Sequence, residues 1–323
     1  MRSITFSEAT LEAMSEEMER DDRVFIMGED IARQGGIFGQ FKGLPQRFGF
    51  ERVKDTPISE TAIVGAGVGA ALAGMRPVVD MHFADFLGVA MDEVFNQMAK
   101  IRYMFGGQTI VPVVLRAPDG IIRSAAAQHS QCIESWFLHI PGLKVVIPSN
   151  PADAKGLLKS AIRDDNPVLY FEHKVLFPMK GEVPDGDHLT PIGKASIVRE
   201  GKDITIISYS LMLHRVLEAA KSLAGSGIEA EVIDLRTISP IDKETIFESI
   251  AKTKRVMIVH EAVKTGGVGA EIAAIIAEEM LDCLDAPIKR LGAPYVPIPF
   301  SPVLEKLVKI GVEDIVNAAQ EIC

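Results

Sequence analysis

The feature of this sequence that most limits its fold is the repeated alternation of short apolar runs with segments of helical periodicity. The runs that predict strands are residues 23–27, 77–81, 110–116, 143–147, 167–172, 203–208, 230–235, 255–260 and 288–291. The segments that predict helices between them are 6–20, 61–74, 89–103, 151–163, 213–223, 243–251 and 268–280. Repeated strand–helix units imply right-handed crossovers and a mainly parallel sheet. We therefore expect an α/β protein built from open, mainly parallel sheets.

One segment interrupts this alternation. The run Pro178–Pro191 (PMKGEVPDGDHLTP) contains three prolines and two glycines, which is typical of a linker. We expect one domain over residues 1–180 and a second over 190–323, because 323 residues can form two cores of ordinary size.

Composition excludes several classes of protein. A net charge of −10 argues against a nucleic-acid partner, because phosphate binding requires clustered lysine and arginine. The three cysteines are scattered, which fits a reducing compartment better than a disulfide framework. The uncharged run 62–75 is too short to span a bilayer of about 30 Å, and the N-terminus lacks the apolar core of a signal peptide. We expect a soluble protein without a membrane partner, most simply in the cytoplasm.

The glycine-rich run Gly65–Gly74 (GAGVGAALAG) looks at first like a dinucleotide-binding loop. That loop requires a third glycine where this chain has Ala70, and it directly follows a strand, whereas the residues before Gly65 are already helical in pattern. Close packing of a helix against a neighbour explains the small residues better.

Two further segments contain candidate chemistry. In Asp55–Glu60 (DTPISE), Pro57 favours extended chain and Ser59 is suited to cap a helix, which would place Glu60 in the first helical turn. The dipole of that helix would favour an ionised carboxylate, although acidic residues are common in first turns. In Ala127–Cys132 (AQHSQC), His129 has the polar setting of a proton-transfer group, with a structural histidine as the alternative. His82 follows a predicted strand, where α/β sheets place ligands.

With these segments in view, the sequence resembles the beta subunits of the decarboxylating component of 2-oxo acid dehydrogenases, of pyruvate, acetoin and branched-chain types. The matching runs are GEDIARQGGIF (28–38), DTPISE (55–60), GAGVGAALAGMRPVVDMHFADF (65–86), AQHSQC (127–132), HIPGLKVVIPS (139–149), SAIRDDNPV (160–168) and EVIDLRTISPID (231–242). They follow one another along essentially the whole chain. The resemblance implies a transketolase-like pyrimidine-binding domain followed by a transketolase C-terminal-type domain.

The resemblance also implies roles for particular residues. Glu60 would hydrogen-bond the N1′ atom of the thiamin diphosphate pyrimidine, with Ile58, His82 and Phe86 beside the ring. His82 departs from the apolar residue expected there. His129 would transfer a proton during acyl delivery to lipoamide. In the RDDNP run, Ala161, Asp164 and Asn166 would form a potassium site.

Partners follow from the same resemblance. Enzymes that use thiamin diphosphate hold its diphosphate and magnesium on a GDG run followed by paired asparagines, and this chain has four asparagines, none adjacent. We expect an alpha subunit to supply that half, in a heterotetramer of two alpha and two beta subunits, and a lipoyl-bearing acyltransferase to accept the acyl group. The AQHSQC run favours pyruvate or acetoin as substrate. The alternatives are a branched-chain enzyme, a nicotinamide-dependent oxidoreductase and a non-catalytic docking subunit.

Overall fold

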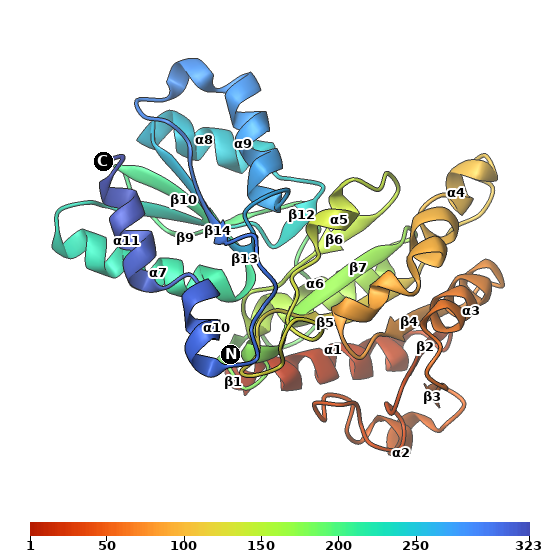
Figure 1. The fold of residues 1–323 in the computed structure, drawn as a ribbon. Helices are drawn as coiled ribbons and strands as arrows, with labels where there is room; N and C mark the ends of the chain where they lie inside the picture. Colours follow the sequence, from red (N-terminus) through yellow and green to blue (C-terminus); the bar gives the residue numbers. More distant parts are fainter. The chain divides into compact units, whose positions relative to one another are not determined.

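The computed structural model describes all 323 residues and divides the chain into two compact units (Figure 1). The first contains Met1–Asp119 and Trp136–Ile192, and the second contains Gly120–Ser135 and Gly193–Cys323. The single linear boundary between 180 and 190 stays a prediction for the domains. The compact units differ from it, because residues 120–135 belong with the second half of the chain.

The first unit has a parallel sheet in the order β6-β7-β5-β4-β2-β3. Its strands are β2 (Val24–Gly28), β3 (Val53–Asp55), β4 (Arg76–Asp80), β5 (Val114–Asp119), β6 (Lys144–Val146) and β7 (Val168–His173). The helical segments are α1 (Phe6–Arg20), α2 (Leu44–Phe48), α3 (Glu60–Leu72), η1 (Ala84–Gly88), η2 (Glu93–Met98), α4 (Ile101–Met104), α5 (Ser135–Leu138), α6 (Pro151–Arg163) and η3 (Lys174–Leu176).

Helix α1 shows how local chemistry fixes an element of this unit. The side chain of Thr5 accepts a hydrogen bond from the backbone N–H of Glu8, and the Glu8 carboxylate accepts one from the N–H of Thr5. This reciprocal capping satisfies donors that a helix start leaves open. The buried face of α1 then packs against α6 (Figure 1).

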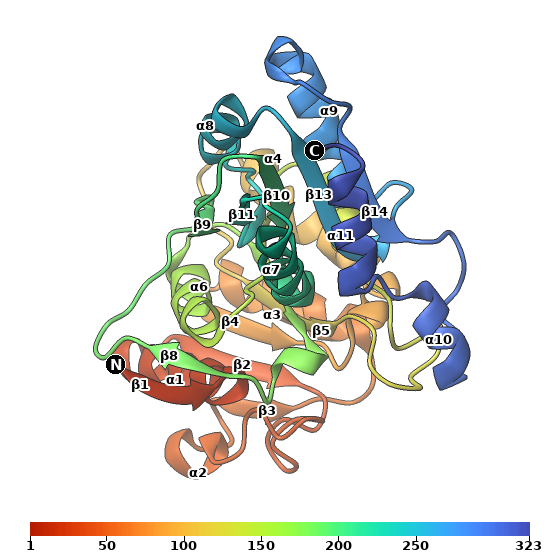
Figure 2. The same cartoon turned by 90° about the vertical axis from the view of Figure 1, so that its left-hand side faces the viewer.

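A small antiparallel sheet accompanies the parallel one. Strand β1 (Arg2–Thr5) pairs with β8 (Lys180–Val183), and Figure 2 shows the two side by side. Strand β8 lies inside the segment expected to be a linker, so part of that segment is ordered sheet.

The second unit is a five-stranded sheet in the order β14-β13-β10-β11-β9, parallel except for β9. The strands are β9 (Ser196–Arg199), β10 (Ile204–Ser208), β11 (Ala230–Asp234), β13 (Val256–Val263) and β14 (Lys289–Ala293), with β12 (Thr237–Ser239) outside this sheet. The helical segments are α7 (Ser210–Gly225), α8 (Lys243–Thr253), α9 (Val268–Glu279), η4 (Leu281–Cys283), α10 (Pro302–Val308) and α11 (Val312–Gln320). Helices α7 and α11 lie side by side and close one apolar core (Figure 2).

The predicted fold class is confirmed, since both units combine mostly parallel sheet with helices. Two element predictions were wrong in detail. The strand expected at 110–116 begins later, after Pro112: β5 starts at Val114 and lies between β4 and β7. The single helix expected at 89–103 is instead the π-helical η2 followed by the short α4. No helix of the structure is long and apolar enough to cross a membrane.

Candidate active site

The candidate site lies at the carboxyl ends of three adjacent strands in the first unit. Strand β2 pairs in parallel with β3 on one side and with β4 on the other. Glu29 directly follows β2, Glu60 follows β3 after a short extended segment, and His82 follows β4. Ligands of open α/β sheets bind at this edge.

Glu60 is the first residue of α3, as the sequence predicted. Its side chain is buried, at 9% relative exposure, and the dipole of α3 favours a negative charge at this end of the helix. Ser59 occupies the capping position, but the predicted capping bond is not formed. Its hydroxyl donates instead to the carbonyl oxygen of Pro57, over 3.4 Å.

A cavity of about 410 Å³ opens beside Glu60. Small residues of α3, among them Ala62, Gly65 and Ala66, leave this space, and Glu93 of η2 borders it. Gly65, Gly67 and Gly69 lie inside α3 rather than on a strand-to-helix turn, which excludes a dinucleotide-binding loop. Gly67 faces the sheet closely: a Cβ atom there would lie 2.4 Å from Cγ2 of Val79.

His82 and Glu29 form a pair at the same edge. The imidazole Nδ1 lies 2.9 Å from Oε2 of Glu29, and both side chains are largely buried. Burial raises the pKa of Glu29, His82 opposes that shift, and the carboxylates of Glu60, Asp30 and Asp80 reinforce it. The sequence indicated His82 but missed Glu29, although both residues carry the same signal, a titratable side chain just beyond an apolar strand.

The two apolar residues expected beside the cofactor differ in burial. Ile58 lies in the extended segment before α3 and is 81% exposed. Phe86 lies in η1, and its ring meets that of Phe83 edge to face, with centroids 5.9 Å apart. Exposure of a large apolar side chain next to Glu60 fits a surface that a ligand or another chain covers.

Beneath this edge lies a buried ion network that the sequence analysis missed. The guanidinium of Arg116, on β5, is fully buried and pairs with Asp80 of β4 and Glu172 of β7. Glu172 also accepts a hydrogen bond from Thr10 over 2.8 Å. Burial raises the pKa of both carboxyl groups, and Arg116 opposes the shift. The sequence signal that could have revealed this network is the presence of charged residues near the ends of apolar strand runs.

His129 lies in the other unit, on a loop within residues 120–135. Carboxylates of that unit hold the loop: Glu261 accepts from the N–H of Ile121 over 3.0 Å, and Glu305 accepts from the N–H of Ser124 over 2.8 Å. His129 itself is partly buried. The structure therefore describes Glu60 and His129, the two predicted catalytic residues, in separate units.

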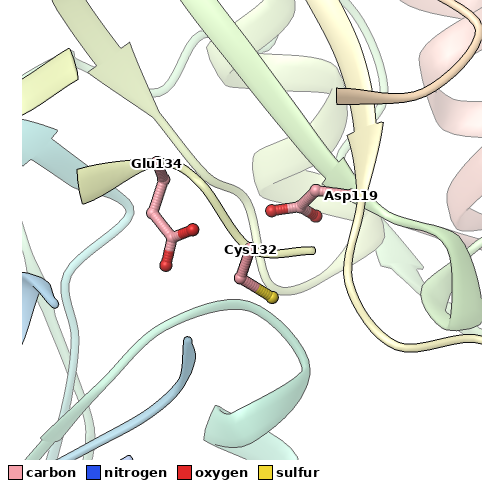
Figure 3. Close-up of side chains that lie close together, drawn as sticks. All are labelled: Asp119, Cys132 and Glu134. Atoms are coloured by element: carbon pink, nitrogen blue, oxygen red, sulfur yellow. The ribbon is translucent and has the colours of Figure 1, made fainter. Parts of the chain in front are cut away.

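The far end of this loop is held through the buried carboxyl group of its own residue Glu134. The hydroxyl of Tyr209 donates to Glu134 over 2.7 Å. Burial raises the pKa of Glu134, and this hydrogen bond opposes the shift. Figure 3 shows the side chains of Cys132 and Glu134 on the loop, and that of Asp119, the last residue of β5.

The RDDNP segment follows α6, and protein cations already surround the oxygens expected to bind potassium. Arg76 donates to the carbonyl oxygen of Asp164 over 3.1 Å, and Lys144 pairs with the Asp164 carboxylate. Arg102 donates to Oδ1 of Asn166 over 2.5 Å, and the carbonyl of Ala161 accepts the N–H of Asp164 over 3.2 Å. A potassium ion here would have to share these oxygens.

Comparison with known proteins agrees with this architecture. Residues 2–180 match the transketolase pyrimidine-binding domain, and residues 193–315 match the transketolase C-terminal domain. A solved structure of a split-gene transketolase, an inactive beta4 tetramer, superimposes with a TM-score of 0.83 at 24% identity, covering 99% of this chain and 98% of that one. This likeness concerns the fold alone.

Curated relatives match over the full length. The 2-oxoisovalerate dehydrogenase subunit beta of Bacillus subtilis is 49% identical, covering 100% of this chain and 99% of the relative. The acetoin:2,6-dichlorophenolindophenol oxidoreductase subunit beta of Cupriavidus necator is 48% identical, over 99% and 97%. The mitochondrial pyruvate dehydrogenase E1 component subunit beta of Dictyostelium discoideum is 46% identical, over 99% and 91%. The chain therefore belongs to the transketolase-like family of 2-oxo acid dehydrogenase E1 beta subunits.

Proposed function

We propose that this chain is the beta subunit of a thiamin-diphosphate-dependent 2-oxo acid dehydrogenase of pyruvate or acetoin type. The aminopyrimidine half of the cofactor would lie at the carboxyl ends of β3, β2 and β4. The observation that carries this proposal is the buried carboxylate of Glu60 at the start of α3, next to a cavity and just after a strand end of the edge that binds ligands in α/β proteins.

Each residue at this edge then has a definable task. Glu60 would share a proton with N1′ of the pyrimidine, and a carboxylate is the residue type able to do so. Ile58 and Phe86 offer apolar surface for the ring, and Ile58 would lose its exposure on binding. Bound thiamin diphosphate supplies an electron sink for breaking the bond next to the substrate carbonyl.

The remaining parts of the reaction require partners. We assign magnesium and the diphosphate to an alpha subunit, in a heterotetramer of two alpha and two beta subunits. A lipoyl-bearing acyltransferase would accept the acyl group, with His129 delivering a proton in that step. An imidazole is suited to this task, because its ordinary pKa lies near neutrality.

Potassium at Ala161, Asp164 and Asn166 stays a prediction. Oxygen ligands suit such an ion, but Arg76, Arg102 and Lys144 already donate to oxygens of this segment. A potassium ion that binds the folded chain at these oxygens should raise the midpoint of thermal unfolding.

Substrate identity has a second candidate. The 49% identity to a 2-oxoisovalerate dehydrogenase subunit favours a branched-chain 2-oxo acid. The test is reconstitution with an alpha subunit, followed by assays with pyruvate, acetoin and 2-oxoisovalerate and an artificial electron acceptor. We expect turnover of pyruvate or acetoin to exceed that of 2-oxoisovalerate. Preference for 2-oxoisovalerate would select the second candidate, and no turnover of any of them by an assembled tetramer would refute the proposed function.

A further inference from the structure

Glu29 and His82 form a buried pair to which the proposed reaction assigns no joint task. The two residues come from different segments, after β2 and after β4, and meet with Nδ1 of His82 2.9 Å from Oε2 of Glu29. Their side chains are 7% and 15% exposed, so water competes little for this contact.

This contact determines which ring nitrogen carries the proton. When Glu29 is ionised, its carboxylate only accepts hydrogen bonds, so Nδ1 is then the donor. In a neutral ring, Nε2 is then left as an acceptor. The Nε2 atom of His82 is buried and has no hydrogen-bond partner within the chain. Buried polar atoms are rarely left in that state, and one that faces a ligand-binding edge is suited to a group of the ligand.

The charges around the pair single out Glu29 as the residue that orients the ring. The acidic groups that influence Glu29 are Asp30, Glu60 and Asp80. Arg116 already pairs with Asp80, and Glu60 lies at the start of α3, where the helix dipole balances its charge. Glu29 is the acid that pairs directly with the imidazole, over 2.9 Å.

We propose that Glu29 is a positioning residue that holds His82 in the Nδ1–H form, so that Nε2 accepts a hydrogen bond from an N–H or O–H group of the bound ligand. This inference rests on the proposed function for the identity of that ligand. Two sources fit the chemistry. One is the amino group of the cofactor's pyrimidine, and the other is the hydroxyl of a 2-hydroxy ketone substrate.

The first test uses the full chain without cofactor, so its outcome does not depend on the proposed function. Nitrogen NMR of the histidine-labelled protein, near pH 8.5 and so about two units above the ordinary imidazole pKa, reports which nitrogen is protonated. The His82 signals are identified by their loss in His82→Gln. We expect Nδ1–H in the wild type and a shift towards Nε2–H, the form that free imidazole favours, in Glu29→Met.

A matched variant controls for the lost charge. Glu51 is an exposed acid whose nearest cation, Lys54, is 3.5 Å away, so Glu51→Met should leave the His82 signals unchanged. Circular dichroism checks that each variant is folded. An Nε2–H ring or a doubly protonated ring in the wild type, or the same form in Glu29→Met, would overturn the assignment of Glu29.

The second test identifies the ligand group in the reconstituted tetramer. Equilibrium dialysis gives the affinity for thiamin diphosphate without substrate, for the wild type, His82→Met and His82→Gln. Loss of one buried hydrogen bond should weaken binding by up to about tenfold in His82→Met, with partial recovery in His82→Gln, if the cofactor supplies the donor. If the hydroxyl of the substrate supplies the donor, the affinity for the cofactor is unchanged. Among the substrates, only acetoin then shows a raised KM. If neither quantity moves, the acceptor role of Nε2 is refuted, whereas Glu60-dependent turnover would persist.

Discussion

At the scale of single residues, Glu60 should govern the first chemical step. Replacing it with glutamine keeps the shape but removes the group that shares a proton with the pyrimidine. We expect Glu60→Gln to assemble normally and to lose about 10²- to 10⁴-fold in decarboxylation, the range typical for removal of an acid–base group. Turnover of the reconstituted variant with an artificial electron acceptor measures this step. Near wild-type turnover would rule Glu60 out, and Glu60→Asp should lose less than the amide.

His129 should separate the two halves of the reaction. Attack on the lipoyl disulfide requires a proton for the leaving sulfur, whereas loss of carbon dioxide does not. We expect His129→Ala to lower acyl transfer to a lipoyl domain more than turnover with an artificial acceptor. Equal losses in both assays would place His129 in an earlier step. His139, an exposed histidine nearby in the sequence, provides the control variant His139→Ala.

Some features of these residues could be predicted from the sequence, and others could not. The position of Glu60 in a first turn was predictable, because Pro57 and Ser59 signal a helix start locally. The Glu29–His82 contact was not, because it joins two strand ends that only the sheet order makes neighbours. Likewise, the oxygens of Asp164 and Asn166 looked open to potassium in the sequence, and three cations from distant positions meet them in the fold.

At the scale of elements, α3 offers a matched pair of glycines. A methyl group at Gly67 would collide with buried Val79, whereas nothing lies within 4 Å of one at Gly69. We expect Gly67→Ala to lower the free energy of unfolding by about 1–2 kcal/mol, because overpacking outweighs the gain in helix propensity. Gly69→Ala should raise it by about 0.5–1 kcal/mol. Urea unfolding of the isolated chain measures both, and equal effects would contradict the close contact of α3 with β4.

Elements with strong local signals were predicted well. Helices α1 and α6 have the bounds that helical periodicity indicated, and most strands of both sheets fall within a few residues of their apolar runs. Two of the elements that were missed lack a distinctive local signal. Strand β8 is too polar to be recognised alone and exists through its pairing with β1, and η2 departs from α-helical hydrogen bonding inside a pattern that reads as ordinary helix.

For the molecule as a whole, we expect the isolated chain to bind thiamin diphosphate weakly or not at all. The edge at Glu60 can hold the pyrimidine, but the metal and diphosphate are assigned to another chain. Titration calorimetry with magnesium and cofactor, with and without the alpha subunit, measures this. Micromolar binding by the isolated chain would contradict the shared site.

The pH dependence of stability should report a buried histidine of the second unit. Burial lowers the pKa of His260 from 6.5 to about 4, so the unfolded chain takes up a proton at pH values where the folded protein does not. Stability from this group is therefore present above pH 6.5 and is lost as the pH falls towards 4. Between pH 7 and 5 the loss should be about 2 kcal/mol. Urea unfolding of wild type and His260→Gln at both values isolates it, since all other groups titrate in both proteins. An equal loss of stability between pH 7 and 5 in both proteins would show that His260 does not contribute.

The assignment of residues 120–135 to the second unit bears on how such genes can be divided or recombined. A fragment that stops at Ile192 would encode the six parallel strands from β2 to β7, yet its His129 loop would lack Glu261, Glu305 and Tyr209, which hold that loop. A chimera joined at residue 192 would likewise combine the loop of one parent with the anchoring carboxylates of the other. The loop and the C-terminal half must therefore come from the same parent sequence, although 57 residues of the first unit separate them along the chain.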